Sequence, residues 1–175
     1  HRLESRAAID PHPGGAVGED VGELIPSAHL AQDYLDHVAQ AVRDFSGSTQ
    51  PLAGLRVVVD GAHGAASDIG PAALEEAGAD VIRLHCEPDG RNINRDAGST
   101  HLEGLQETVV ALGAHMGVAY DGDADRCLAV DHTGAVINGD HILGLLSVAM
   151  RESGTLYRDT LVATVMSNLG LHRAM

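Results

Sequence analysis

Lysine and tryptophan are absent from this chain of 175 residues, and aromatic residues make up only 2% of it. All 11 basic residues are therefore arginines, and a core must be built from alanine, valine, leucine and isoleucine. We interpret the missing lysine as a bias of genomic composition, because protein surfaces normally mix both cations. Hydrophobic residues still reach 44%, which is enough for a packed domain and argues against disorder.

Positive charge and cysteine are also scarce. Acidic residues outnumber basic ones by 25 to 11, and because this excess repels a phosphate backbone, nucleic-acid binding is not expected. Cys86 and Cys127 are too few for a disulfide framework and fit a reducing cytosol. No apolar run approaches the length of a membrane span, and residues 1–25 lack the apolar core of a signal peptide. We therefore expect a cytoplasmic protein that does not bind membranes.

The chain contains 11 histidines, which raises the question of zinc. They are scattered, without a Cys-x-x-Cys pair or two histidines at helical spacing beside an acid. The zinc hypothesis is therefore weak.

The order of patterns along the chain predicts three parts. Residues 1–27 are rich in Gly, Pro and acids and read as a connector or the tail of a preceding domain. Residues 28–137 read as an α/β domain with a mostly parallel sheet flanked by helices, because strand and helix patterns alternate there. Residues 138–175 read as the truncated start of a second, similar α/β domain.

Individual elements follow from hydrophobic spacing and breakers. In the middle part we expect helices at 28–45, 71–79 and 100–113, strands at 55–60, 80–86 and 115–120, and a hairpin turning at 132–134. Thr100 and Glu103 have the spacing of a capping box, which we favour over a catalytic role for the intervening His101. In the last part we expect Asp140 to cap a helix, followed by a strand at 161–166.

Three carboxylates, Asp121, Asp123 and Asp125, directly follow the strand expected at 115–120. Ligands bind beyond the carboxyl ends of parallel strands, and residues at i, i+2 and i+4 can direct oxygens toward one point when the backbone curls. Carboxylate oxygens suit a hard cation such as Mg²⁺, and Arg126 adds a cation for phosphate. The leading interpretation is a magnesium site.

Other interpretations of this stretch are a solvated acidic turn, a calcium loop and an aspartyl-phosphate site with Asp121 as nucleophile. A calcium loop would need Gly where Arg126 stands and Glu where His132 stands. A third carboxylate at Asp125 serves a metal better than it serves a nucleophile. His63 lies in a glycine-rich turn that could approach a phosphate through backbone N–H groups, but tight-turn geometry explains it more simply.

The stretch DGDADR resembles the metal-binding loop of the α-D-phosphohexomutases. VVVDGAHGAAS is similar to the strand and glycine-rich turn of their second domain. GRNINRDAGSTHLEGLQ and DGDADRCLAVDHTGAVINGDHIL resemble the bacterial phosphoglucosamine mutases in particular. The resemblance covers about residues 50–175 well and the preceding residues weakly.

The resemblance implies a magnesium-dependent enzyme of four domains that interconverts glucosamine 6-phosphate and glucosamine 1-phosphate through a phosphoserine. It implies that Asp121, Asp123 and Asp125 are magnesium ligands and that Arg126 contacts phosphate. The remaining domains of the enzyme and the phosphosugar would be the partners, and a homodimer stays open. The family's Thr-Ala-Ser-His-Asn-Pro motif and its Glu-x-Ser-Gly-His sugar-recognition loop do not occur in this chain, which is expected to be inactive alone. A non-catalytic metal- or phosphate-binding module and a phosphomannomutase or phosphoglucomutase remain alternatives.

Overall fold

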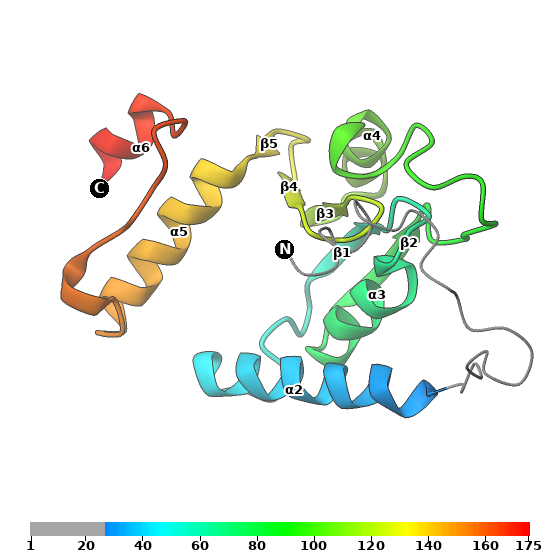
Figure 1. Cartoon of the computed structure of the whole chain (residues 1–175), viewed down its shortest axis with the longest axis horizontal. Coiled ribbons are helices and arrows are strands. Elements are labelled where there is room, and N and C mark those ends of the chain that lie inside the picture. The colour runs from blue at the N-terminus through cyan, green and yellow to red at the C-terminus, as the bar shows by residue number, and fades with distance from the viewer. Residues whose placement is uncertain (1–26) are drawn as a thin grey trace, which may run out of the picture. The chain divides into compact units, whose positions relative to one another are not determined.

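The computed structural model describes residues 27–175. Its central feature is one mixed β-sheet (Figure 1). The connector expected at 1–27 lies outside the described residues, apart from Ser27. The strands are β1 (Arg56–Asp60), β2 (Asp80–Leu84), β3 (Met116–Tyr120), β4 (Cys127–Asp131) and β5 (Val136–Ile137), in the order β2-β1-β3-β4-β5. β1 pairs in parallel with β2 and β3, and β4 and β5 continue the sheet antiparallel. The expected mostly parallel sheet is confirmed.

Helices precede, connect and follow the strands in the described part of the chain. They are α2 (Ala28–Ser46), α3 (Ala66–Glu76), α4 (Glu103–Leu112), α5 (Gly139–Glu152) and α6 (Leu169–Ala174), with short 3₁₀ turns η2 (Gly98–Thr100) and η3 (Tyr157–Asp159). α3 joins β1 to β2 and α4 joins β2 to β3, and Figure 1 shows these two helices on opposite sides of the strands. Within the described residues, no helix combines the length and apolarity needed to span a membrane.

The core lies where α4 packs on the centre of the sheet. β1 is buried along its valines, as expected of a strand covered on both faces. Leu105 and Val109, one helical turn apart on α4, are fully buried against it. A Cβ at Gly117 of β3 would lie 2.7 Å from side-chain carbons of both, so this glycine lets the helix approach the strand closely. The sheet and α4 therefore form a tightly fitted unit.

The hairpin of β4 and β5 turns at 132–134, as the sequence predicts. One oxygen of Asp131, Oδ1, accepts hydrogen bonds from the Thr133 N–H at 2.8 Å, the Thr133 hydroxyl at 2.6 Å and the Ala135 N–H at 3.0 Å. Asp131 therefore closes the turn through its side chain, in the manner of an Asx turn.

Two expected helix starts are wrong. Thr100 belongs to the separate turn η2, so α4 begins later, at an N-cap residue Leu102 that makes no side-chain cap bond. α5 is capped by Asn138, whose side chain accepts the His141 N–H at 3.2 Å, because the chain becomes helical directly after β5. Asp140 lies inside the first turn and instead accepts the Asn168 N–H at 3.0 Å.

The strand expected at 161–166 is also wrong. These residues form no strand, and Val162 and Val165 are 85% and 100% exposed. A β-strand needs a neighbour to satisfy its backbone groups, and none of the described strands pairs with this segment. The apolar pattern was read correctly, but it does not produce a strand without a partner. The helix expected at 71–79 is shifted, since α3 occupies Ala66–Glu76.

Candidate functional site

Residues 121–126, here called the acidic loop, leave the carboxyl end of β3 and return the chain into β4. The Asp121 carbonyl accepts the Ala124 N–H at 3.0 Å, and Ala124 takes a left-handed conformation with φ of 61°. This bend reverses the chain within four residues. The curl that the spacing of the aspartates predicted is therefore present, and its left-handed residue is Ala124 rather than Gly122.

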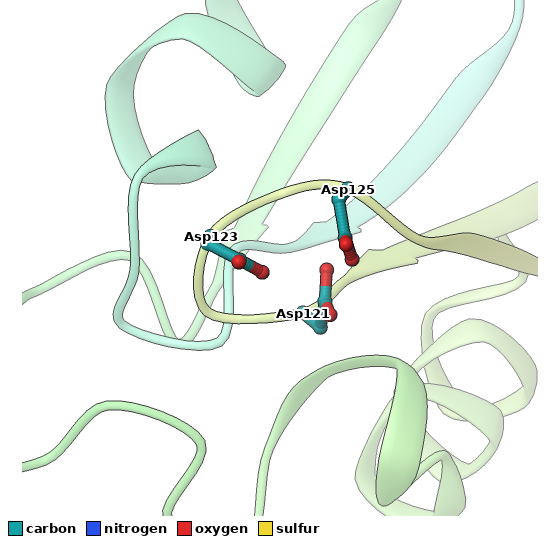
Figure 2. Close-up of side chains that lie close together, drawn as sticks. All are labelled: Asp121, Asp123 and Asp125. Atoms are coloured by element: carbon teal, nitrogen blue, oxygen red, sulfur yellow. The ribbon is translucent and has the colours of Figure 1, made fainter. Parts of the chain in front are cut away.

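The three aspartates converge. Their ligand atoms all lie within 4.8 Å of one another, and Figure 2 shows the side chains directed from the rim of the loop toward one point. Asp121 is buried at 2% exposure, whereas Asp123 and Asp125 are exposed. Among the histidine, cysteine and acidic side chains of residues 27–175, these three aspartates are the only group of three or more that could hold a metal ion.

Arg126 holds the buried aspartate from both its backbone and its side chain. Its N–H donates to Asp121 Oδ1 at 3.0 Å, and its Nε donates to Asp121 Oδ2 at 2.7 Å. The same Nε lies 3.5 Å from Asp125 Oδ1. The arginine side chain is nevertheless 65% exposed, and it lies at the carboxyl edge of the sheet. That placement suits a contact with an anion.

The pKa shifts of the acidic loop reflect three carboxylates that lie close together. The Arg126 backbone N–H, together with its guanidinium, lowers the pKa of Asp121. The pKa of Asp125 is raised, first by its hydrogen bond with Asp121 and then by the charge of Asp123. The bond to Asp121 raises the pKa of Arg126 in turn. One arginine therefore does not relieve the repulsion among three carboxylates, and a further cation at this place would be bound favourably.

Two neighbouring segments, the turn between β1 and α3 and residues 93–94, contact the acidic loop at Gly122. The turn between β1 and α3 donates the Ala65 N–H to the Gly122 carbonyl at 2.9 Å. Gly64 of the same turn packs on the backbone of Gly122, and a Cβ there would lie 2.7 Å from Gly122 Cα. From the other segment, Ile93 and Asn94 occupy the space that a Cβ at Gly122 would need. The glycine-rich turn is thus used for close backbone packing on Gly122, a role that the sequence-based interpretation as a tight turn did not include.

The histidines singled out by the sequence do not join the aspartates. His63 packs its ring against His85, with centroids 5.3 Å apart, and accepts the Glu87 N–H at 3.2 Å. His101 is exposed and lies within 3.2 Å of the Thr100 hydroxyl. Neither belongs to the group around the acidic loop.

Sequence reasoning missed Asp60. This residue ends β1, is 0% exposed, and accepts three hydrogen bonds at the carboxyl edge of the sheet. The available signal was its position, because Asp60 ends one parallel strand and Asp121 directly follows another. Single carboxylates at strand ends are common, however, and only the fold shows that this one is buried.

Comparison with known proteins places this geometry in a family. Residues 32–134 match the family model described as phosphoglucomutase/phosphomannomutase, alpha/beta/alpha domain II. The chain is 52% identical over 177 residues to phosphoglucosamine mutase of Mycobacterium ulcerans, covering all of this chain and 38% of that protein. It is 56% identical over 159 residues to phosphoglucosamine mutase of Rhodococcus erythropolis, covering 91% of this chain and 34% of that protein.

The fold agrees with solved structures. A phosphoglucomutase/phosphomannomutase family protein of Burkholderia thailandensis superposes with a TM-score of 0.59 at 23% identity, over 71% of this chain and 26% of that chain. The chain spans 38% of the length of the first curated relative it matches. The match of the family model shows that the chain belongs to the phosphoglucomutase/phosphomannomutase family, with residues 32–134 as its α/β/α domain II.

Proposed function

We propose that this chain supplies the metal-holding domain of a magnesium-dependent phosphosugar mutase that interconverts glucosamine 6-phosphate and glucosamine 1-phosphate. The observation that carries the proposal is the convergence of Asp121, Asp123 and Asp125 beside Arg126 at the carboxyl edge of a parallel sheet. The choice of sugar rests on the name phosphoglucosamine mutase shared by the curated relatives. The phosphoserine that donates phosphate would lie outside this chain.

The donor set fits magnesium. All three groups offer carboxylate oxygens, which a hard cation prefers over nitrogen or sulfur ligands. Two hydrogen bonds from Arg126 occupy only part of the acceptor capacity of Asp121, because an ionised carboxylate has about four lone-pair sites. Asp123 and Asp125 are exposed and open to a ligand. When bound, Mg²⁺ would neutralise negative charge on a phosphoryl group during transfer.

The residues of the chain would position the reacting groups. Asp121, fixed by Arg126, gives the acidic loop one rigid ligand, and the two exposed aspartates complete the set. Arg126 keeps its Nε on Asp121, and because most of its side chain is exposed, its terminal nitrogens would be available to a phosphate. Phosphoryl transfer depends mainly on such positioning and charge stabilisation. Catalysis would then require the serine-bearing segment to face this loop.

We also propose that residues 138–175 begin a further α/β unit. Val162, Val165 and Met166 are at least 85% exposed, which is unusual for large apolar residues that lie so close together in the chain. Such residues would be buried if the segment paired with additional strands. This proposal can be tested by limited proteolysis, because cleavage near 161–166 should be faster in this chain than in a protein that carries the rest of the relatives' length.

The deciding experiment uses Asp123→Ala in a protein that joins this chain to the serine-bearing and remaining segments. Asp123 is chosen because it is exposed, whereas Asp121 also holds Arg126 in place. We expect loss of magnesium-supported mutase activity of at least about 100-fold with an unchanged fold, as for the loss of a metal that stabilises transition-state charge. Glu107→Ala, which removes one exposed carboxylate from α4, is the matched control and should retain activity.

Full turnover in Asp123→Ala would overturn the proposal. Comparing glucosamine, glucose and mannose phosphates in the same coupled assay distinguishes the phosphoglucosamine mutase from a phosphoglucomutase or phosphomannomutase. The 175-residue chain alone should show no turnover, because it contains no Thr-Ala-Ser-His-Asn-Pro motif. Conversion of glucosamine 6-phosphate by that chain would contradict the role assigned to an external serine.

A further inference from the structure

Asp60 gathers three separate segments at the edge of the sheet that carries the acidic loop. Its Oδ1 accepts the Ala62 N–H at 2.9 Å, in the turn between β1 and α3. Its Oδ2 accepts the Gly98 N–H at 3.0 Å and the His85 Nδ1–H at 2.9 Å. All of these donors reach a side chain with 0% exposure. A buried carboxylate with three donors is a strong constraint on the segments that supply them.

One segment held by Asp60 touches the acidic loop directly, and another touches the residue that leads into it. The turn that contains Ala62 continues to Gly64 and Ala65, which pack on and donate to Gly122. Gly98, with φ of 77°, packs on the carbonyl of Tyr120, the residue immediately before Asp121. Backbone that Asp60 fixes thus packs on the loop at Gly122 and on Tyr120, where β3 enters the loop.

The two segments are also tied to each other. The Ala62 carbonyl accepts the Asn94 N–H at 2.9 Å, and a Cβ on Gly98 would lie 2.5 Å from Ala62 Cβ. Asn94 in turn lies against Gly122. Ala62 and Asn94 both have left-handed backbones, with φ of 52° and 57°. Asparagine adopts this conformation readily, but alanine rarely does, and the Ala62 N–H is held by the Asp60 carboxylate.

We infer that Asp60 is a positioning residue for the metal site, which fixes the acidic loop through the backbone of the 62–65 turn and of Gly98 so that Asp121, Asp123 and Asp125 stay convergent. Asp60 itself does not touch a metal ligand. The inference rests on the proposed function, because it assigns Asp60 a part in metal binding. Groups behind the ligands of a metal site typically change its affinity by 10- to 100-fold when they are replaced.

The test compares Asp60→Asn with Val109→Ala in the 175-residue chain. An asparagine has the size of aspartate, but its NH₂ would face the N–H of either Ala62 or Gly98 and leave that donor without an acceptor. Val109→Ala creates a cavity in the core under α4 and lowers stability without touching the acidic loop or its neighbours. His85→Phe removes one of the three hydrogen bonds and keeps a ring beside His63.

Two readouts are measured on each variant: the Mn²⁺ dissociation constant by electron paramagnetic resonance, and metal-free hydrogen exchange of the Ala65 and Arg126 amides. Asp60→Asn should weaken Mn²⁺ binding by on the order of tenfold, by analogy with other outer groups of metal sites. It should also speed exchange at both amides, which donate to Gly122 and Asp121. Val109→Ala should leave Mn²⁺ affinity within about twofold, as a distant and independent change would.

Unchanged exchange and affinity in Asp60→Asn would overturn the inference. Equal losses in Asp60→Asn and Val109→Ala would also overturn it, since they would reflect stability alone. If Asp60→Asn does not fold, His85→Phe decides: a rise in the dissociation constant of about threefold is expected from one lost hydrogen bond, and no rise contradicts the inference. If the parent chain binds no Mn²⁺ while exchange still responds to Asp60→Asn, the proposed function fails and the positioning of the loop stands.

Discussion

Ala124 carries the left-handed bend of the acidic loop, with φ of 61°. This conformation costs a residue with a Cβ about 1–2 kcal/mol, and a branched side chain fits it worst. Ala124→Val should therefore open the loop and weaken Mn²⁺ binding by about tenfold, the equivalent of 1.4 kcal/mol. Ala124→Gly should bind Mn²⁺ at least as well as the parent chain, because glycine adopts positive φ freely. A calorimetric titration of the three chains checks both outcomes, and equal affinity of the valine variant would argue against a role for this bend.

Ionisation of Asp131 contributes to the stability of the fold and makes it depend on pH in the acid range. The Thr133 hydroxyl, with the backbone N–H groups of Ala135 and Thr133, lowers the pKa of Asp131 below its usual value of 3.8. A carboxyl with a lowered folded-state pKa stabilises the fold above its unfolded pKa, and the stabilisation is lost as the pH falls through the folded value. Asp131→Asn keeps an acceptor oxygen but cannot ionise. The thermal midpoint of the parent chain should therefore fall more steeply than that of the variant between about pH 5 and pH 2. Parallel curves would show that Asp131 does not contribute.

At the scale of elements, the site is an assembly of turns at one edge of the sheet. β1 and β3 are adjacent and parallel, with Asp60 in register with Ala119, so their following turns meet. Close contact between these turns depends on Gly64, whose added Cβ would lie 2.8 Å from the Gly122 carbonyl carbon. Backbone on both sides leaves little room for relaxation.

Gly64→Ala should accordingly destabilise the chain by about 1–3 kcal/mol, the usual cost of overpacking, and should weaken Mn²⁺ binding in the same step. Gly104→Ala is its control, because a Cβ there meets only His85 Cε1 at an ordinary 3.6 Å. Inside α4 that change should stabilise the helix by about 0.5–1 kcal/mol. Chemical denaturation and Mn²⁺ titration of both variants provide the measurements, and similar results for the two glycines would refute the packing argument.

Elements with strong local patterns could be predicted from the sequence. The valines of β1 and the hairpin at 132–134 were recognised because continuous β-branched residues and turn residues act locally. The aspartates of the acidic loop were recognised for the same reason, since their spacing and the end of β3 lie in one stretch. These features do not depend on distant parts of the chain.

What the sequence did not reveal depends on contacts between distant residues. Asp60 receives a hydrogen bond from Gly98, 38 positions away, which no local pattern encodes. The starts of α4 and α5 were misplaced because they depend on where the preceding elements η2 and β5 end. As a result, α4 begins after Leu102, which makes no side-chain cap bond, and α5 begins after Asn138. The segment 161–166 has the apolar pattern of a strand, but strand formation depends on a partner.

At the scale of the whole chain, two features affect its behaviour in solution: its net charge and its exposed apolar residues. The formal charge of −14 leaves the acidic loop in a negative surrounding that attracts cations and that salt screens. The chain also carries exposed apolar residues around 161–166, while it spans 38% of the length of the first curated relative.

We expect those exposed residues to favour self-association of the chain. LVATVM is six residues long, uncharged, free of proline and rich in β-branched side chains, which is the composition of segments that stack into intermolecular cross-β aggregates. Light scattering of the 175-residue chain should therefore rise with concentration and time. Val165→Lys should suppress this rise by placing a gatekeeper charge at a fully exposed position, whereas Val110→Lys, on the surface of α4, should not. The same six residues that fail to become a strand alone would then become one between molecules.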